Sequence, residues 1–163
     1  MKKRIVCLIL CTSLFLTGCG FFGTRIKEPV TFHYLCGSYQ EDLCCVIASE
    51  EREASGHTGD LAYLLALYLM GPTDDELIMP LPPGTRISAQ KQDGHIVLEL
   101  SDTSDSLSEV EFMLSCACLT LTCLEITEAE DVTIRSGDRE KTMNRNTLTL
   151  YDATSESLPT EEP

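Results

Sequence analysis

The first 19 residues limit how much of this 163-residue chain can belong to a fold. Met1 is followed by three basic residues, Lys2 to Arg4, and then by an uncharged, mostly apolar segment of 12 residues, 5–16. A bilayer-spanning helix needs about 20 apolar residues, so this segment is too short to span. A basic start, a short apolar core and small residues before a cleavage point are the layout of a secretion signal. We therefore expect residues 1–18 to be removed, which leaves 145 residues, enough for one domain.

The four residues at the end of this segment point to a lipid anchor. Leu16-Thr17-Gly18-Cys19 resembles the lipobox of bacterial lipoproteins, in which the residue at Gly18 must be small and the Cys19 thiol accepts diacylglycerol. Two acyl chains on one residue give stable anchoring, whereas one chain alone is marginal. The alternative is an ordinary cleaved signal followed by a cysteine that stands there by chance. We expect lipidation at Cys19, with attachment to the membrane through that lipid.

The charge of the chain excludes one class of partner. It has 12 basic and 26 acidic residues, and loss of Lys2, Lys3 and Arg4 with the signal leaves nine against 26, a net charge of −17. Contacts to phosphates need Lys and Arg, so we expect no nucleic-acid binding. An anionic membrane surface would repel such a chain, and the lipid would have to hold it there.

Six cysteines remain beyond the signal and Cys19, and their state is left open by the sequence. An even number in an exported chain is typical of disulfides, whereas their position inside apolar runs is typical of free thiols that pack as small apolar groups. In a helix, Cys116 and Cys118 would point about 200° apart, which argues against one metal ion between them. We expect neither a metal nor another cofactor. The six are Cys36, Cys44, Cys45, Cys116, Cys118 and Cys123.

The remaining pattern predicts a small α+β domain. Residues 30–36 alternate as a strand and 43–48 resume one, which together predict a hairpin, and 50–59 is predicted as a polar loop. Asp60 is a suitable N-cap for a helix over 61–70, and a second helix is predicted over 107–126 with Asp105 or Ser106 as its cap. Strands are predicted at 86–91, 95–100 and 132–134, with a further one at 147–151. The class is a mostly antiparallel sheet with two helices packed on one face.

Composition divides the chain into four parts. Residues 1–18 are the signal, 19–29 the lipidated cysteine and its tether, 30–151 the folded domain and 152–163 an acidic tail. The tail is predicted to be disordered, because it has almost no apolar residues with which to form a core.

Short motifs in the middle of the chain resemble the GerMN domain family of sporulation and spore germination proteins. The segment 67–73 resembles the helix end and "GPT" turn of that family, 81–87 its "LPxGT" step into a strand, and 93–101 its "DGxxxVDLS" hairpin. Segments 120–122 and 132–134 resemble its "TLT" helix and the strand that follows. The resemblance covers Thr31 to about Tyr151 and implies a fold similar to the ring-building domains of sporulation channels. The family motif turns are Gly71, Pro72, Thr73, Pro82, Gly84, Thr85, Asp93 and Gly94.

The motif residues have chemistry that suits turns rather than catalysis. Gly and Pro set backbone direction, and none of the motif glycines or prolines supplies a nucleophile, a base or a metal ligand. The three histidines, His33, His57 and His95, lack the close spacing of a metal-binding motif. There is no GxSxG sequence and no phosphate-binding glycine loop. We therefore expect no enzymatic activity.

The second predicted helix carries two apolar stripes where a helix lying on a sheet needs one. The second stripe must be covered by the first helix, by the tail or by another protein. As a hypothesis it is an interface through which the domain contacts another copy or another protein, and cover within the chain is the alternative. This candidate interface consists of Phe112, Cys116, Leu119 and Cys123.

Together, the lipobox and the family resemblance imply an extracytoplasmic lipoprotein of a Gram-positive, spore-forming bacterium. Its expected role is a non-enzymatic scaffold or assembly component in sporulation or spore germination, with sporulation or envelope proteins or further copies of itself as partners. The alternative is a general envelope-binding module that recognises peptidoglycan or another envelope protein in growing cells.

Overall fold

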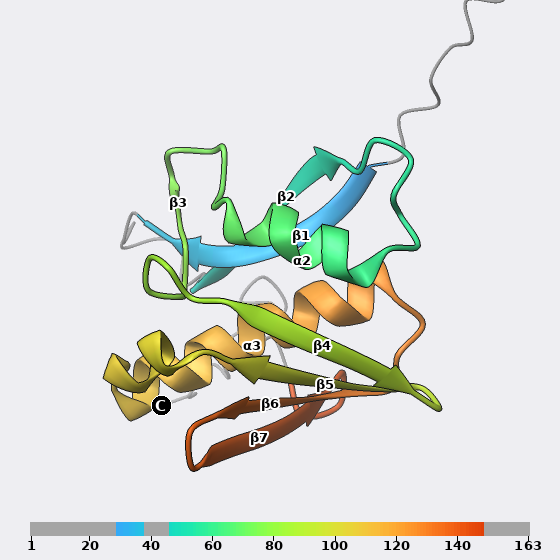
Figure 1. Cartoon of the computed structure of the whole chain (residues 1–163). Helices are drawn as coiled ribbons and strands as arrows, with labels where there is room; N and C mark the ends of the chain where they lie inside the picture. Colours follow the sequence, from blue (N-terminus) through green and yellow to red (C-terminus); the bar gives the residue numbers. More distant parts are fainter. Residues whose placement is uncertain (1–28, 38–45, 149–163) are drawn as a thin grey trace, which may run out of the picture.

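The computed structural model describes residues 29–37 and 46–148 (Figure 1). The predictions for the signal, the lipobox, Cys19, the tether up to residue 28, Cys44, Cys45 and the tail 152–163 lie outside the described residues. No helix within the described part is both long and apolar enough to cross a membrane.

The first sheet has three strands in the order β2-β1-β3. Strand β1 (Pro29–Cys36) pairs antiparallel with β2 (Ile47–Glu53) along its whole length and with the short β3 (Leu77–Ile78) at its end. Alternate residues of β1, Val30, Phe32 and Tyr34, are buried. The polar loop predicted from residue 50 begins later than expected, because Glu50–Glu53 continue β2.

The second sheet has four strands in the order β4-β5-β6-β7. The predicted hairpin forms from β4 (Ile87–Gln92) and β5 (His95–Leu100), joined by Asp93 and Gly94 with φ values of 50° and 82°. Positive φ at both central residues is the requirement of the two-residue turn that the Asp-Gly sequence predicts. Strand β6 (Asp131–Ser136) runs parallel to β5, and β7 (Arg139–Asn144) closes the sheet antiparallel to β6.

Helix α2 (Leu61–Leu69) begins at the predicted N-cap. The carboxylate of Asp60 accepts a hydrogen bond from the backbone N–H of Tyr63. Tyr68 of this helix stacks on Tyr34, with 4.8 Å between ring centroids, and makes a tilted contact with Phe32. These aromatic contacts fix α2 on one face of the first sheet.

Helix α3 (Glu109–Ile126) lies between the two sheets and connects β5 to β6 after a 3₁₀ turn, η1 (Asp102–Ser106). It packs against β1 on one side and against β6 and β7 on the other (Figure 1). Its N-cap is Ser108 rather than the expected Asp105 or Ser106, because Ser108 and Glu111 form a reciprocal capping box. A helix between two sheets must be apolar around most of its circumference, which accounts for both stripes.

The α+β class, the two helices and the mostly antiparallel strands are as predicted. The strands form two sheets rather than one, and α3 is enclosed by both instead of lying on an outer face. Strand β7 was missed, because its sequence is polar at most positions and only Met143 is buried. A last strand was expected to begin at residue 147. Residue 147 instead belongs to a turn, and residue 148 follows that turn without regular structure.

Candidate functional site

The Gly71-Pro72-Thr73 turn at the end of α2 is held by two charged side chains of β2. The Arg52 guanidinium donates to the backbone oxygens of Leu67, at 3.1 Å, and Gly71, at 2.9 Å. The Glu50 carboxylate accepts hydrogen bonds from the backbone N–H and the hydroxyl of Thr73. Arg52 and Glu50 were not predicted as site residues, because their charged segment was expected to be a loop.

The second motif turn, Pro82 to Thr85, is held by hydroxyl groups. The Thr85 hydroxyl donates to the Pro82 oxygen at 2.8 Å and accepts from Thr103 at 3.2 Å. The Ser101 hydroxyl, at the end of the third motif, accepts from the backbone N–H of Arg86 at 3.0 Å. Gly71, Gly84 and Gly94 all have positive φ, in keeping with their expected role in turns.

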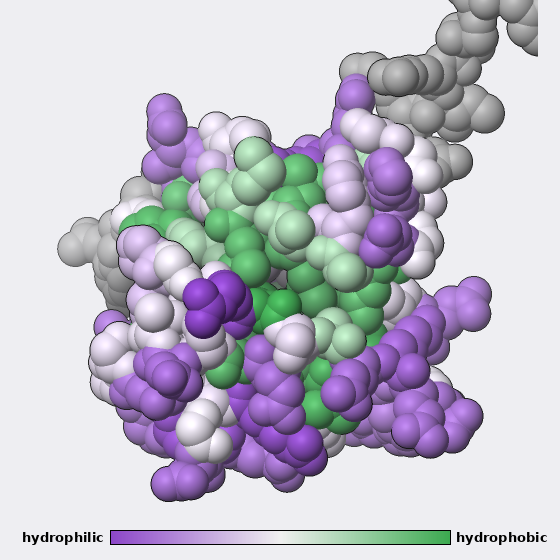
Figure 2. Space-filling view, viewed as in Figure 1, coloured by the Kyte–Doolittle hydropathy of each residue, from purple (hydrophilic) through white to green (hydrophobic). Residues whose placement is uncertain are grey.

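The first two motif turns meet around one surface hollow of about 220 Å³. One wall is the end of α2 with Gly71, and the other is the segment 79–85. Met70 projects beside it with 77% of its surface exposed. Figure 2 shows an apolar area on this face of the molecule, over α2 and toward β4. The lining residues are Leu69, Met70, Gly71, Met79, Leu81, Pro82, Pro83, Gly84 and Thr85.

The hollow is therefore lined by apolar side chains, turn glycines and one hydroxyl. Its volume is below the ~300–1,000 Å³ typical of small-molecule sites. Polar and apolar surface contribute about equally to this lining. We call it the motif hollow.

The third motif turn, Asp93-Gly94, borders a different hollow of about 260 Å³ on the outer face of the second sheet. Its walls are Gln90, Gln92, Asp93, His95 and Val97. His95 Nδ1 lies 2.8 Å from the Asp131 carboxylate, and this contact is the main reason that the pKa of His95 is raised.

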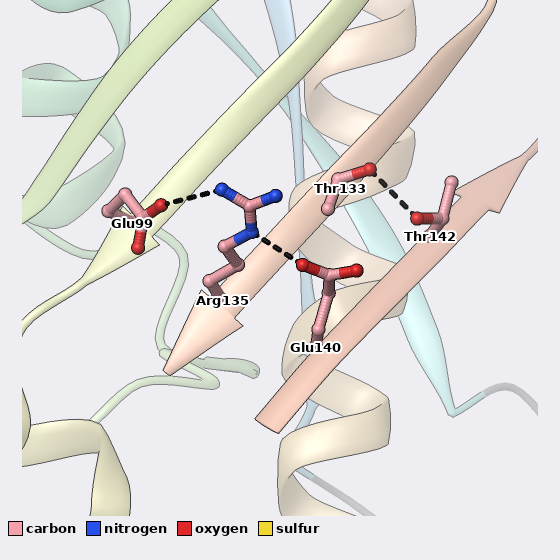
Figure 3. A network of polar contacts seen from close by, with 5 residues as sticks. All are labelled: Glu99, Thr133, Arg135, Glu140 and Thr142. Carbon is pink, nitrogen blue, oxygen red and sulfur yellow. Dashed lines mark hydrogen bonds and ion pairs between the residues drawn. The ribbon is translucent and has the colours of Figure 1, made fainter. Parts of the chain in front are cut away.

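The rest of that outer face is a ladder of polar pairs across strands (Figure 3). Arg135 lies between Glu99 and Glu140, at 3.2 and 2.5 Å, and the hydroxyls of Thr133 and Thr142 are 2.8 Å apart. These pairs are solvent-exposed, so they add little stability but keep the face hydrophilic.

The candidate interface on α3 is not at the surface. Phe112 is 2% exposed, and Cys116, Leu119 and Cys123 are completely buried. The two sheets cover this stripe, so the alternative of cover within the chain holds and the interface prediction for these residues is wrong. The apolar residue that α3 does expose is Val110, at 68%.

Burial also shifts the pKa values of titratable side chains in the interior of the described part. It raises the pKa values of Cys116, Cys118 and Cys123 to about 12, and all three are free thiols. Burial lowers the pKa of His33, whose backbone N–H donates to Thr122 of α3 and whose backbone oxygen accepts from Tyr68. Thiols with such high pKa values are protonated at neutral pH, so they are poor nucleophiles and metal ligands.

No protein-family model matches the chain, and no curated protein matches it in sequence. Among solved structures it is similar to a protein from Clostridium perfringens assigned as a lipoprotein, with 16% identity over 77% of this chain and 93% of that one, at a TM-score of 0.46. It is also similar to the first GerMN domain of the sporulation protein GerM from Bacillus subtilis, with 17% identity over 69% and 86% of the two chains and a TM-score of 0.49. It is similar as well to a structure of the tandem GerMN domains of the same protein. The identity is 15% over 70% of this chain and 41% of that one, at a TM-score of 0.45. These likenesses concern the fold alone.

Proposed function

We propose that this chain is a lipoprotein held by Cys19 on the outer face of the cytoplasmic membrane, in a Gram-positive, spore-forming bacterium. Its folded domain acts there as a non-enzymatic scaffold or assembly component in sporulation or spore germination. The observation that carries the proposal is the lipobox, Leu16 to Cys19, ten residues ahead of the first strand at Pro29. A tether of that length keeps the domain within about 35 Å of its anchor.

The motif hollow supports a binding role. The turns that resemble the GerMN family are braced by Arg52, Glu50 and Thr103, and they enclose a surface hollow. A concave surface with braced walls is suited to receiving a side chain of another protein.

The anchor is tested by growing cells with labelled palmitate. The wild-type chain is expected to incorporate the label and to sediment with membranes, whereas Cys19→Ala incorporates none. Cys11→Ala, within the signal itself, is the matched control and is expected to keep the label. Label on the Cys19→Ala variant would contradict the anchor.

The role is tested by following the tagged protein, expressed from its own locus, through growth and sporulation. Appearance only after asymmetric division, in the membrane around the forespore, is the expected result. A steady level around the envelope of growing cells would overturn the sporulation role.

A second candidate function is a general envelope module that binds the cell wall. The hollow on the outer face of the second sheet favours it, because the amides of Gln90 and Gln92 stand beside His95 and the apolar Val97. Amides and imidazole are suited to hydrogen-bonding the hydroxyl and acetamido groups of wall polymers. Co-sedimentation with purified peptidoglycan, lost in Gln90→Ala with Gln92→Ala and kept in Met70→Gln, would favour this function over the first.

A further inference from the structure

Within the described residues, four strands stand at the edges of the two sheets, β2 and β3 in the first and β4 and β7 in the second. An edge strand presents unpaired backbone N–H and C=O groups, and proteins usually protect it with charges or keep it short. Strand β3 has two residues, β2 has four charged residues in succession at 50–53, and β7 has three at 139–141. Strand β4 is six residues long and carries one charge, Lys91, near its turn. It is therefore the least protected edge of the described part.

The register of β4 shows which of its backbone groups are unpaired. Gln92 pairs with His95 across the two-residue turn, and such a closing pair exchanges both hydrogen bonds. Gln92 and every second residue before it therefore bond toward β5, in keeping with the hydrogen bond from the Ser101 N–H to the oxygen of Arg86. The groups that point the other way have no hydrogen-bond partner among the described residues. They are the N–H and C=O groups of Ile87, Ala89 and Lys91.

Helix α2 lies against β4 and gives the two faces of this edge different surroundings (Figure 1). Ile87 and Ala89 are half-buried and pack against the core that α2 also joins, whereas Gln90 and Gln92, on the opposite face, are exposed. A strand bonded to the edge would continue the same two faces, because side chains alternate across a sheet. One of its faces would look toward the core and α2, and the other toward solvent.

The surface of α2 that remains open is apolar. Ala62, Ala66 and Met70 follow one another at four-residue spacing, which places them on one side of the helix, and all three are exposed. The helix itself has no charged residue. Figure 2 shows the apolar area over α2 and toward β4. The face of an added strand that looks toward α2 therefore suits apolar side chains.

The unpaired groups of β4 identify the occupant of this edge by its chemistry. Donors and acceptors at three alternate positions are satisfied by another backbone in extended conformation. We propose that the edge of β4 is a docking surface for an extended segment of a partner protein, which adds a strand to the four-stranded second sheet. In this segment apolar residues, which face α2, alternate with polar residues, which face solvent beside Gln90. The inference rests on the proposed function, since it names the kind of partner that such a scaffold binds.

A separate extended segment fits this edge better than a second copy of the chain. Two copies that paired through their β4 strands would be related by a two-fold axis, so each α2 would approach the β4 and the α2 of the other copy. A segment without a helix beside it meets no such obstacle.

The test uses the mature lipidated protein in nanodiscs of neutral phosphatidylcholine and the fluorescein-labelled peptide Thr-Val-Thr-Val-Thr-Val-Thr, with binding measured by fluorescence anisotropy. Two further probes carry one N-methyl group each, on the central valine or on the threonine that follows it. An added strand turns alternate amides toward β4. One methylated probe is therefore expected to bind about tenfold more weakly and the other like the parent. A probe of the same composition with its valines in one block is expected to bind weakly, because it lacks the alternation.

Protein variants test the edge and the helix separately. Ala89→Pro removes one outward N–H and keeps the bonds to β5, since an edge strand tolerates proline where the N–H faces away from the sheet. It is expected to weaken binding about tenfold. Ala66→Glu places a carboxylate on the open side of α2 and is expected to weaken binding several-fold. Val110→Glu, at a residue 68% exposed on α3, is the matched control and is expected to bind like wild type. Circular dichroism verifies the fold of each variant, and the methylated probes need no change to the protein.

Three results would overturn the inference. These are equal binding of the two methylated probes, no binding of the parent probe at millimolar concentration, and dimers in ultracentrifugation that Ala89→Pro abolishes. The assay does not depend on when the protein is expressed. A failure of the sporulation role and a failure of this docking surface are therefore measured separately.

Discussion

Arg52 is the residue on which the end of helix α2 depends most directly. A helix leaves its last carbonyl oxygens without partners inside the helix. Here one guanidinium from β2 donates to the oxygen of Leu67, near the end of α2, and to that of Gly71, in the turn that follows. The same guanidinium lies 5.8 Å from the ring centroid of Phe32. A single side chain thus links the motif turn, the helix and the first sheet.

Replacement of Arg52 should loosen this corner of the domain. In Arg52→Met the apolar stem is kept but both hydrogen bonds are lost, so we expect the free energy of unfolding to fall by about 1.5–3 kcal/mol, the range for hydrogen bonds to charged groups. Urea denaturation followed by circular dichroism measures the change. Arg86→Met, at an exposed position, is the control and should shift stability by less than about 0.5 kcal/mol. Equal effects of the two changes would contradict the capping role.

The pKa values of two histidines should be shifted in opposite directions. The hydrogen bond to Asp131 raises the pKa of His95, and burial lowers the pKa of His33, relative to the ordinary value of 6.5. The His95 contact therefore stabilises the folded state below pH 6.5 and is lost as pH rises through its raised pKa. NMR titration of the ring protons measures both values. In Asp131→Asn the His95 value is expected to return toward 6.5 while that of His33 stays where it is, and a joint shift of the two would refute these assignments.

At the scale of elements, β7 is joined to the start of α3 by Arg139. Its guanidinium donates to the backbone oxygens of Leu107, at 2.9 Å, and Ser104, at 2.7 Å, and lies 4.2 Å from the ring centroid of Phe112. Arg139→Met should lower the free energy of unfolding by about 2–4 kcal/mol, because two carbonyl groups lose a charged donor and a cation–π contact disappears. Arg135→Met is the matched control on the neighbouring strand. Its side chain is 45% exposed, so about 0–1 kcal/mol is expected.

The three thiols of α3 make the domain sensitive to alkali. Burial raises the pKa values of Cys116, Cys118 and Cys123 from 9.0 to about 12. Between pH 9 and 12 the unfolded chain loses these protons while the folded chain keeps them, so stability should fall with rising pH, by at most about 1.4 kcal/mol per pH unit for each thiol. Urea midpoints measured from pH 8 to pH 10 under reducing conditions test this. A variant with alanine at all three positions should show a shallower fall, and a wild-type midpoint that stays constant to pH 10 would contradict the burial.

The elements that the sequence predicts well are those with local signals. Asp60 before an apolar run and Gly71-Pro72 after it mark both ends of α2, and Asp93-Gly94 marks the β4–β5 turn. Strands β2 and β7 lack such signals, because Glu50 to Glu53 and Arg139 to Lys141 are charged and read as loop. They are strands because β1 and β6, the strands that precede them in the chain, supply hydrogen-bonded neighbours, and this pairing does not show in the composition of a charged segment.

The candidate site was predictable in its parts but not in its assembly. The turn residues were identified from their backbone chemistry, yet only the fold brings residues 69–71 and 79–85 around one hollow. The interface prediction failed for the same reason. Two apolar stripes on α3 indicate two covered sides, and the sequence does not say whether the cover is a second sheet or a second protein.

The whole molecule is organised around α3, and this arrangement gives the last prediction. Leu119 and Phe112 are buried between the sheets, at 0% and 2% exposure, so a charge at either position would have no partner in the interior. Phe112→Glu and Leu119→Glu are expected to unfold the domain, whereas Val110→Glu, on the exposed side of the same helix, should leave it folded.

Because α3 contacts both sheets, Leu119→Ala should lower the free energy of unfolding by about 2–5 kcal/mol, and both sheets should unfold in one common transition. The Tyr34–Tyr68 stack reports the first sheet in near-ultraviolet circular dichroism, and the His95 ring reports the second by NMR. Separate midpoints for the two reporters would mean that the sheets fold independently, and α3 would then not be their common core.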